Sequence, residues 1–101
     1  MAFRHLAEGQ QGYGSRIGFR FLSGRMTSLP YTHLVETVFD PDSGIVLEFV
    51  GRRVVISGRN LVGLYHAIED ETVGEVTEQH ANDMAVPESE PYISRIQWDA
   101  A

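Results

Sequence analysis

The sequence predicts a mainly β protein: a small antiparallel meander, strongly bent or barrel-like, with one short helix after the fifth strand and two further strands. Between residues 16 and 57, apolar and polar side chains alternate in short runs, which is the period of half-buried strands. Turn-forming residues separate these runs, most clearly in DPDSG at 40–44. After residue 60 the apolar spacing changes to that of one helical face.

Length and composition indicate one domain. A chain of 101 residues can bury one compact core and is too short for two ordinary domains. We therefore expect a single β-rich domain over 16–101, after a Gly- and Gln-rich flexible arm over 1–15. No apolar run approaches the roughly 18 residues of a membrane span, and the arm lacks the apolar centre of a secretory signal. We expect a cytoplasmic protein with no membrane partner, and without cysteine its core must be stabilised by packing alone.

Five strands are expected in the first part of the domain. They cover residues 16–22, 26–31, 33–39, 45–50 and 53–57. Pro30 cannot donate to a ladder, so it must lie at an edge, an end or a bulge. The expected core is one shared apolar face of these strands, made by Phe19, Phe21, Ile45, Leu47, Phe49, Val54 and Ile56.

A short helix should follow the fifth strand. The residues at helical spacing are Leu61, Leu64, Tyr65 and Ile68. Asn60 is the expected N-cap, because its side chain can accept a hydrogen bond from a free amide of the first turn. Gly63 lowers the stability of this helix by about 1 kcal/mol relative to alanine. We expect the helix to cover one open side of the sheet.

Two further strands are expected in the C-terminal part. The segment TVGEVTE (72–78) should be a strand at an edge, and YISRIQW (92–98) should close the fold. Alternation places Tyr92, Ile96 and Trp98 on one face of this last strand. Between the two strands we expect a long polar loop with two prolines.

Charge is unevenly distributed along the chain, and its total is −6. Residues 1–60 contain seven arginines against five acids, whereas residues 61–101 contain one arginine against nine acids. A general nucleic-acid binder gains affinity by neutralising phosphates, so an acidic chain argues against that class. A local patch of arginines on one face is still compatible with this composition.

Two segments resemble the signatures of Sm and Sm-like proteins. VVISGRNLVGL (54–64) has the apolar strand, Gly-centred turn and resumed apolar run of the second signature. FRFLSGR (19–25) is similar to the first strand and turn of the other signature. The resemblance covers about 16–65, and it implies a small barrel that forms rings and binds RNA.

The chain departs from the Sm pattern where RNA would bind. Those proteins place a helix before the first strand, where this chain has its Gly- and Gln-rich arm. Their RNA pocket uses an Asp and an Asn after the second strand, and this chain has no Asn between Gly24 and Arg59. Ser57 stands where an arginine usually precedes the glycine of the second signature. We therefore expect no tight RNA binding at physiological salt.

The candidate anion- or RNA-binding residues are Arg52, Arg53 and Arg59. They flank one predicted strand, so the turns before and after it could both be positive. The alternative is that they are solvated turn arginines with partners such as Glu48.

Metal and catalytic sites have little support in the sequence. His33 has Glu36 at i+3 and His66 has Asp70 at i+4, but catalytic zinc needs three protein ligands around an open position. No HExxH or GxSxG motif occurs. We expect no catalytic residue, no bound metal and no cofactor, although the sequence leaves open whether His33 or His66 binds a metal.

The expected function is a non-catalytic interaction or assembly module. The alternatives are an Sm-like RNA-binding ring protein and a small metal-dependent hydrolase. The strand at 16–22 has only Arg16 and Arg20 to guard an apolar edge, so we expect pairing between subunits and a homo-oligomer. Self-closure through 92–98, which would give a monomer, is the alternative. A protein partner fits this class, and nucleic acid is not an expected partner.

Overall fold

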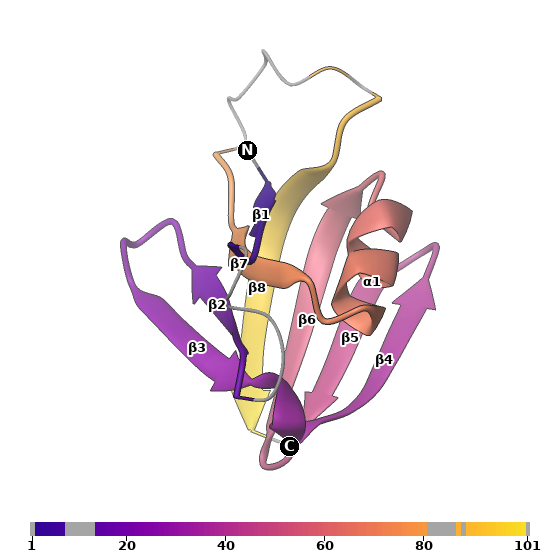
Figure 1. Cartoon of the computed structure of the whole chain (residues 1–101). Helices are drawn as coiled ribbons and strands as arrows, with labels where there is room; N and C mark the ends of the chain where they lie inside the picture. Colours follow the sequence, from indigo (N-terminus) through magenta and orange to yellow (C-terminus); the bar gives the residue numbers. More distant parts are fainter. Residues whose placement is uncertain (1, 8–13, 81–86, 88, 101) are drawn as a thin grey trace.

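Two four-stranded sheets enclose one core in the computed structural model, which describes residues 2–7, 14–80, 87 and 89–100 (Figure 1). Sheet A has the order β1 (Phe3–His5), β7 (Val73–Thr77), β2 (Arg16–Arg20) and β3 (Met26–Pro30). Sheet B has the order β4 (Leu34–Asp40), β5 (Gly44–Phe49), β6 (Arg52–Arg59) and β8 (Tyr92–Ala100). The 3-10 helix η1 (Tyr31–His33) joins β3 to β4, and helix α1 (Val62–Glu69) joins β6 to β7. The predicted mainly β class is confirmed.

The predicted five-strand meander is divided between the two sheets. β2 pairs with β3 in sheet A, whereas β4, β5 and β6 form an antiparallel meander in sheet B. The division follows Pro30, the last residue of β3. Tyr31 anchors the corner, because its amide donates to the carbonyl oxygen of Ser15 at 3.0 Å and its buried hydroxyl donates to that of Val73 at 2.7 Å. The structure thus divides the predicted meander at this corner, because alternation does not encode which sheet a strand joins.

Sheet A places the first predicted strand in its interior. β2 pairs with β3 on one side and runs parallel to β7 on the other, with Gly18 opposite Glu75. The expected free edge at 16–22 is therefore wrong, and so is the edge position expected for 72–78. The edges are β1 and β3, and β1 comes from the segment expected to be an arm. Residues 8–13 of that arm lie outside the described residues.

β8 pairs with β6, and a bulge changes which of its side chains enter the core. The register shifts between Ser57 and Gly58, so Ile93 is fully buried and Tyr92 is only half-buried. The shared face expected for Tyr92 and the later residues of the strand is therefore interrupted. A Cβ at Gly58 would lie 1.9 Å from the carbonyl oxygen of Tyr92, so the close approach of the strands requires glycine there.

Helix α1 forms where it was expected but is capped differently. Asn60 has a positive φ of 57°, and its side-chain amide donates to the carbonyl oxygen of Glu90 at 3.2 Å. Leu61 is the N-cap, with no side-chain cap hydrogen bond. The prediction that Asn60 caps the helix is therefore wrong, because this residue instead makes the left-handed turn from strand to helix.

The apolar stripe of α1 packs on the core beside β4. Leu61, Leu64 and Ile68 are buried. The ring of Tyr65 lies 5.9 Å from that of Phe39 in β4. Figure 1 shows the helix beside β4 of sheet B and leading into β7 of sheet A, so it covers one open side of the fold as expected.

Side chains from both sheets meet in one core. Six of the seven predicted core residues are buried, namely Phe19, Ile45, Leu47, Phe49, Val54 and Ile56. The ring of Phe19 in sheet A lies 6.5 Å from Phe49 and 5.6 Å from Trp98, both in sheet B. Phe21 is only half-buried because β2 ends at Arg20, and its ring lies 6.2 Å from Trp98.

Residues 78 and 79 join the two sheets where β7 ends. The Glu78 amide donates to the carbonyl oxygen of Arg20 in sheet A at 2.9 Å, and the Gln79 amide donates to that of Ile93 in sheet B at 2.9 Å. The Ile93 amide in turn donates to Gln79 Oε1 at 2.8 Å. We call the hydrogen bonds made by the backbone and side chains of Glu78 and Gln79 to the two sheets the Glu78 seam.

The Glu78 carboxylate accepts backbone hydrogen bonds from the turn after β2 and from β8. Oε1 accepts from the amide of Leu22, just after β2, at 2.9 Å, and Oε2 accepts from the amide of Ile96 in β8 at 2.8 Å. Among the described residues, no strand of sheet A pairs with a strand of sheet B. The fold is therefore a bent sandwich and not a closed barrel. The seam links the sheets where a closed barrel would have a continuous ladder.

We expect the Glu78 carboxylate to contribute measurably to stability. Glu78→Ala should lower the free energy of unfolding by about 2 to 3 kcal/mol, because two backbone amides lose a charged acceptor. Glu78→Gln should lower it by about 1 to 2 kcal/mol, because its NH₂ group cannot accept from the second amide. Urea denaturation measures both. Glu90→Gln, at an exposed position, is the control and should change stability by less than about 0.5 kcal/mol. A similarly small loss in Glu78→Ala would contradict the seam.

Tyr31 should make the protein sensitive to alkaline pH. Burial raises the pKa of its hydroxyl above the ordinary value of 10, and the nearby charge of Glu71 acts in the same direction, while the hydrogen bond to Val73 opposes them. Above about pH 10 the unfolded chain therefore loses this proton while the folded chain keeps it, so stability falls as pH rises. The chain has no lysine or cysteine, so few other side chains titrate in this range.

Denaturation between about pH 8 and 11 tests this expectation. Tyr31→Phe should be less stable at pH 8 by about 1 kcal/mol and should lose much of the alkaline decline. Tyr92→Phe, which removes a hydroxyl at an exposed hydrogen bond, leaves Tyr31 intact and should keep the decline. An identical decline in Tyr31→Phe would show that Tyr31 is not its source.

Candidate functional site

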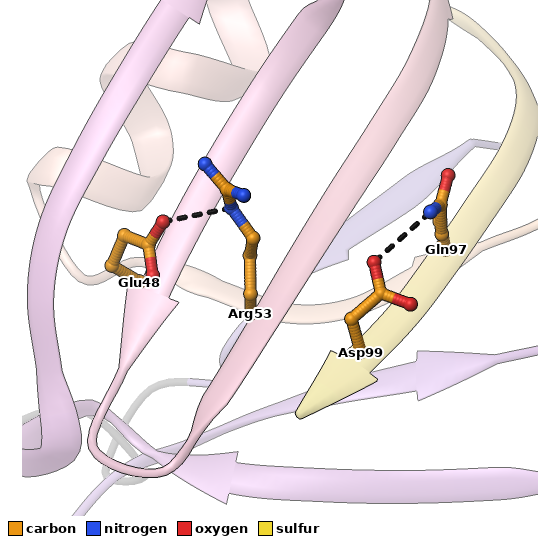
Figure 2. Close-up of polar contacts among 4 residues, drawn as sticks. All are labelled: Glu48, Arg53, Gln97 and Asp99. Carbon is orange, nitrogen blue, oxygen red and sulfur yellow. Dashed lines mark hydrogen bonds and ion pairs between the residues drawn. The ribbon is translucent and has the colours of Figure 1, made fainter. Parts of the chain in front are cut away.

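The three arginines singled out from the sequence do not converge. Arg53 lies on the outer face of sheet B, and its Nε is 2.8 Å from Glu48 Oε1 (Figure 2). Arg52 is the preceding strand residue and points to the other face, where its guanidinium lies 4.8 Å from the centroid of the Trp98 ring. Arg59 lies at the far end of β6, about 20 Å along the strand. Anion binding by these residues stays a prediction, but one shared site would have to bridge both faces.

A shallow depression of about 510 Å³ surrounds Arg59. It is lined by Asp42, Ser43, Val55, Ser57, Gly58, Arg59, Tyr92 and Ser94. The Ser57 hydroxyl donates to the carbonyl oxygen of Ser43 at 3.4 Å, and the Ser94 hydroxyl donates to that of Ser57 at 3.2 Å. The Arg59 guanidinium lies 5.0 Å from the Tyr92 ring. Because Asp42 balances the one cation, this depression has no net charge to attract an anion.

The outer face of sheet A carries a different group of arginines, which we call the basic face. Its charged residues are Arg4, Arg16, Arg20 and Glu75. Arg20 Nε lies 3.3 Å from Glu75 Oε1, so the remaining net charge comes from Arg4 and Arg16. Arg16 alternates with the buried Ile17 and Phe19 along β2, and Arg4 lies on β1, on the other side of β7.

The outer face of sheet B, which we call the acidic face, has the opposite sign. Register pairs the side chains in rows across the strands. Two rows cross all four strands: Glu36, Glu48, Arg53 and Asp99, then Val38, Val46, Val55 and Gln97. At the next position Asp40 lies opposite Gly44, and Ser57 lies opposite Arg95. Four acids thus stand against two arginines, around a central row rich in valine. Figure 2 shows the pair of Glu48 with Arg53, and the amide of Gln97 donating to Asp99 Oδ2 at 2.9 Å.

The sequence contained only part of the signal for the basic face. The alternation of β2 already placed Arg16 and Arg20 together on its polar side. Arg4, however, fell in the segment expected to be a flexible arm, and its approach to β2 depends on the pairing of β1 with β7. Long-range pairing of this kind leaves no local pattern in a sequence.

Metal ligands do not gather in the part of the chain that the structure describes. No group of three or more His, Asp or Glu side chains there could hold an ion. His66 Nδ1 lies 3.5 Å from Glu69 Oε1, one turn along α1, rather than beside Asp70. His33 is exposed in η1. The metal-dependent alternative therefore gains no geometric support from these residues.

Comparisons with known proteins add no relative. A scan against family models found no match, and neither a search of curated proteins nor a search of solved structures found a significant one. The Sm-like resemblance therefore stays a prediction. Within the described residues, no helix is long and apolar enough to cross a membrane.

Proposed function

We propose that this chain is a non-catalytic assembly module that joins copies of itself head to tail. In this arrangement the basic face of one copy contacts the acidic face of the next. The observation that supports it is the opposite charge of the two outer sheet faces, in a protein whose total charge is −6. Opposite faces of complementary charge steer encounters and suppress wrong orientations.

The acidic face also has the layout of a protein interface. Three valines run across its centre, and charged side chains lie in the rows on either side. Val38 in this row is 38% exposed, and Met26 on the basic face is 61% exposed, so both faces offer apolar surface as well as charge. An apolar centre with a polar rim is the usual composition of protein–protein contacts.

This proposal changes the route of self-association that the sequence suggested. The strand at 16–22 is paired on both sides, so backbone pairing along it is closed to a second subunit. A contact between two different faces is heterologous: it produces a ring if the rotation closes and a filament if it does not. Oligomer size would then follow from the angle between the two faces.

Two charge-neutralising variants test the proposal. The basic-face variant carries Arg4→Gln and Arg16→Gln, and the acidic-face variant carries Glu36→Gln and Asp99→Asn. Each should be monomeric by analytical ultracentrifugation, because each has lost one half of the contact. Mixed one to one they should form a heterodimer and nothing larger, since each retains the face that the other lacks.

Wild type should associate at low salt and dissociate as ionic strength rises, because salt screens exposed charges. Arg25→Glu, in the turn after β2, and Asp70→Arg, after α1, are single charge reversals away from the charged rows and should associate like wild type. A wild type that stays monomeric at about 0.5 mM in low salt, or variants that do not complement each other, would overturn the proposal. Salt-dependent binding of RNA or of an acidic peptide by the basic face, without self-association, would also overturn it.

A further inference from the structure

The basic face contains a depression of about 350 Å³ between β1, β7, β2 and β3. It is lined by Arg4, Arg16, Gly18, Met26, Thr27, Ser28, Gly74 and Glu75. We call it the arginine-lined depression. It lies over the middle of sheet A, on the side away from the core.

Two glycines on neighbouring parallel strands form the floor of this depression. A Cβ at Gly18 would lie 3.3 Å from the carbonyl oxygen of Gly74, so a side chain there would occupy the space that is now open. A Cβ at Gly74 would lie 2.9 Å from Arg4 Nη1. The Arg4 guanidinium therefore rests directly on the backbone of β7 at the edge of the depression.

The second arginine is held in place by a neighbouring strand. Arg16 Nε donates to Ser28 Oγ at 3.0 Å, and Arg16 Nη2 donates to the carbonyl oxygen of Ser28 at 3.2 Å. A guanidinium has five N–H groups, so about three remain for a ligand. Because Ser28 already fixes the side chain, little conformational entropy is lost when a ligand binds.

Charge in the depression favours an anion. Glu75 is the acid among the lining residues, and its carboxylate is already paired with Arg20, whose Nε lies 3.3 Å from Glu75 Oε1. Among the described residues, Arg4 has no carboxylate within ion-pair distance, and Arg16 bonds to the neutral Ser28 and to no acid. Two guanidinium groups beside a small open floor match the size and bidentate geometry of a carboxylate.

We propose that the arginine-lined depression binds the Glu36 carboxylate of the next copy. This inference rests on the proposed head-to-tail function and names the contact within it. The other acids of the acidic face have partners in their own chain: Glu48 pairs with Arg53, Asp99 accepts from Gln97, and Asp40 accepts from the amide of Asp42. Glu36 is exposed on the edge strand β4 and has no such partner among the described residues.

The first test compares two glutamates on the same face. The substitutions are made in the basic-face variant, which keeps its acidic face, and the acidic-face variant is its binding partner. Glu36→Gln should raise the dissociation constant of this heterodimer about tenfold or more, because a paired carboxylate is lost. Glu48→Gln changes the charge of the face by the same amount but should weaken binding by about threefold at most. Isothermal titration calorimetry measures both dissociation constants.

The second test fills the depression without changing charge. Gly18→Val in the acidic-face variant, whose basic face is intact, should weaken the heterodimer about tenfold or more. Gly18→Ala is the milder second variant, since Gly18 does not have a positive φ and can accept a side chain. Gly63→Ala, on the open side of α1, is the matched control and should leave affinity unchanged. Thermal denaturation of each variant shows whether it is folded at the temperature of the titration.

The outcomes separate this inference from the function on which it rests. If the heterodimer forms but Glu36→Gln and Glu48→Gln weaken it equally, and Gly18→Val or Gly18→Ala binds like Gly63→Ala, general charge holds the faces together and the inference is overturned. If no heterodimer forms, the proposed function is overturned as well. Selective losses in Glu36→Gln and in the Gly18 variants support the inference.

Discussion

One carboxylate, that of Glu78, links the two sheets of this small protein by accepting hydrogen bonds from the turn after β2 and from β8. Sheet A and sheet B share a core, but strand pairing does not continue from one to the other among the described residues. Glu78 and Gln79 satisfy backbone groups of β8 that a further strand would otherwise have to satisfy. Buried amides without acceptors are costly, so this connection lets two short sheets remain a sandwich.

The sandwich gives the protein two outer faces of different composition. Because side chains alternate along each strand, burying Ile17 and Phe19 of β2 necessarily points Arg16 and Arg20 outward. The same constraint in sheet B places acids and valines on the opposite outer face. The seam holds the sheets in a fixed relation, so the two charged faces also keep a fixed relation. Because the two faces carry opposite charge, the basic face of one copy can attract the acidic face of another even though the chain as a whole is negative.

Local patterns in the sequence were sufficient for the strands from 16 to 57, the helix and most of the core, because burial acts through a two-residue or a helical period. They failed where pairing is long-range. The parallel contact of β2 with β7, the strand at the N-terminus and the bulge beside Gly58 depend on segments far apart in the chain. The arginines singled out from the sequence are separated for a related reason: Arg52 and Arg53 are adjacent in sequence and therefore point to opposite faces, whereas Arg4 and Arg16 are brought together only by β7.

Amide hydrogen exchange, measured residue by residue by NMR, tests the Glu78 seam most directly. Leu22 lies in a turn and Ile96 lies on the outer strand of sheet B, positions whose amides exchange quickly when only water accepts from them. The seam predicts that both amides exchange slowly, and much more slowly than the amide of Ser23 in the same turn. If Leu22 and Ile96 exchange as fast as Ser23, the carboxylate does not hold the two sheets together and the account of this fold is wrong.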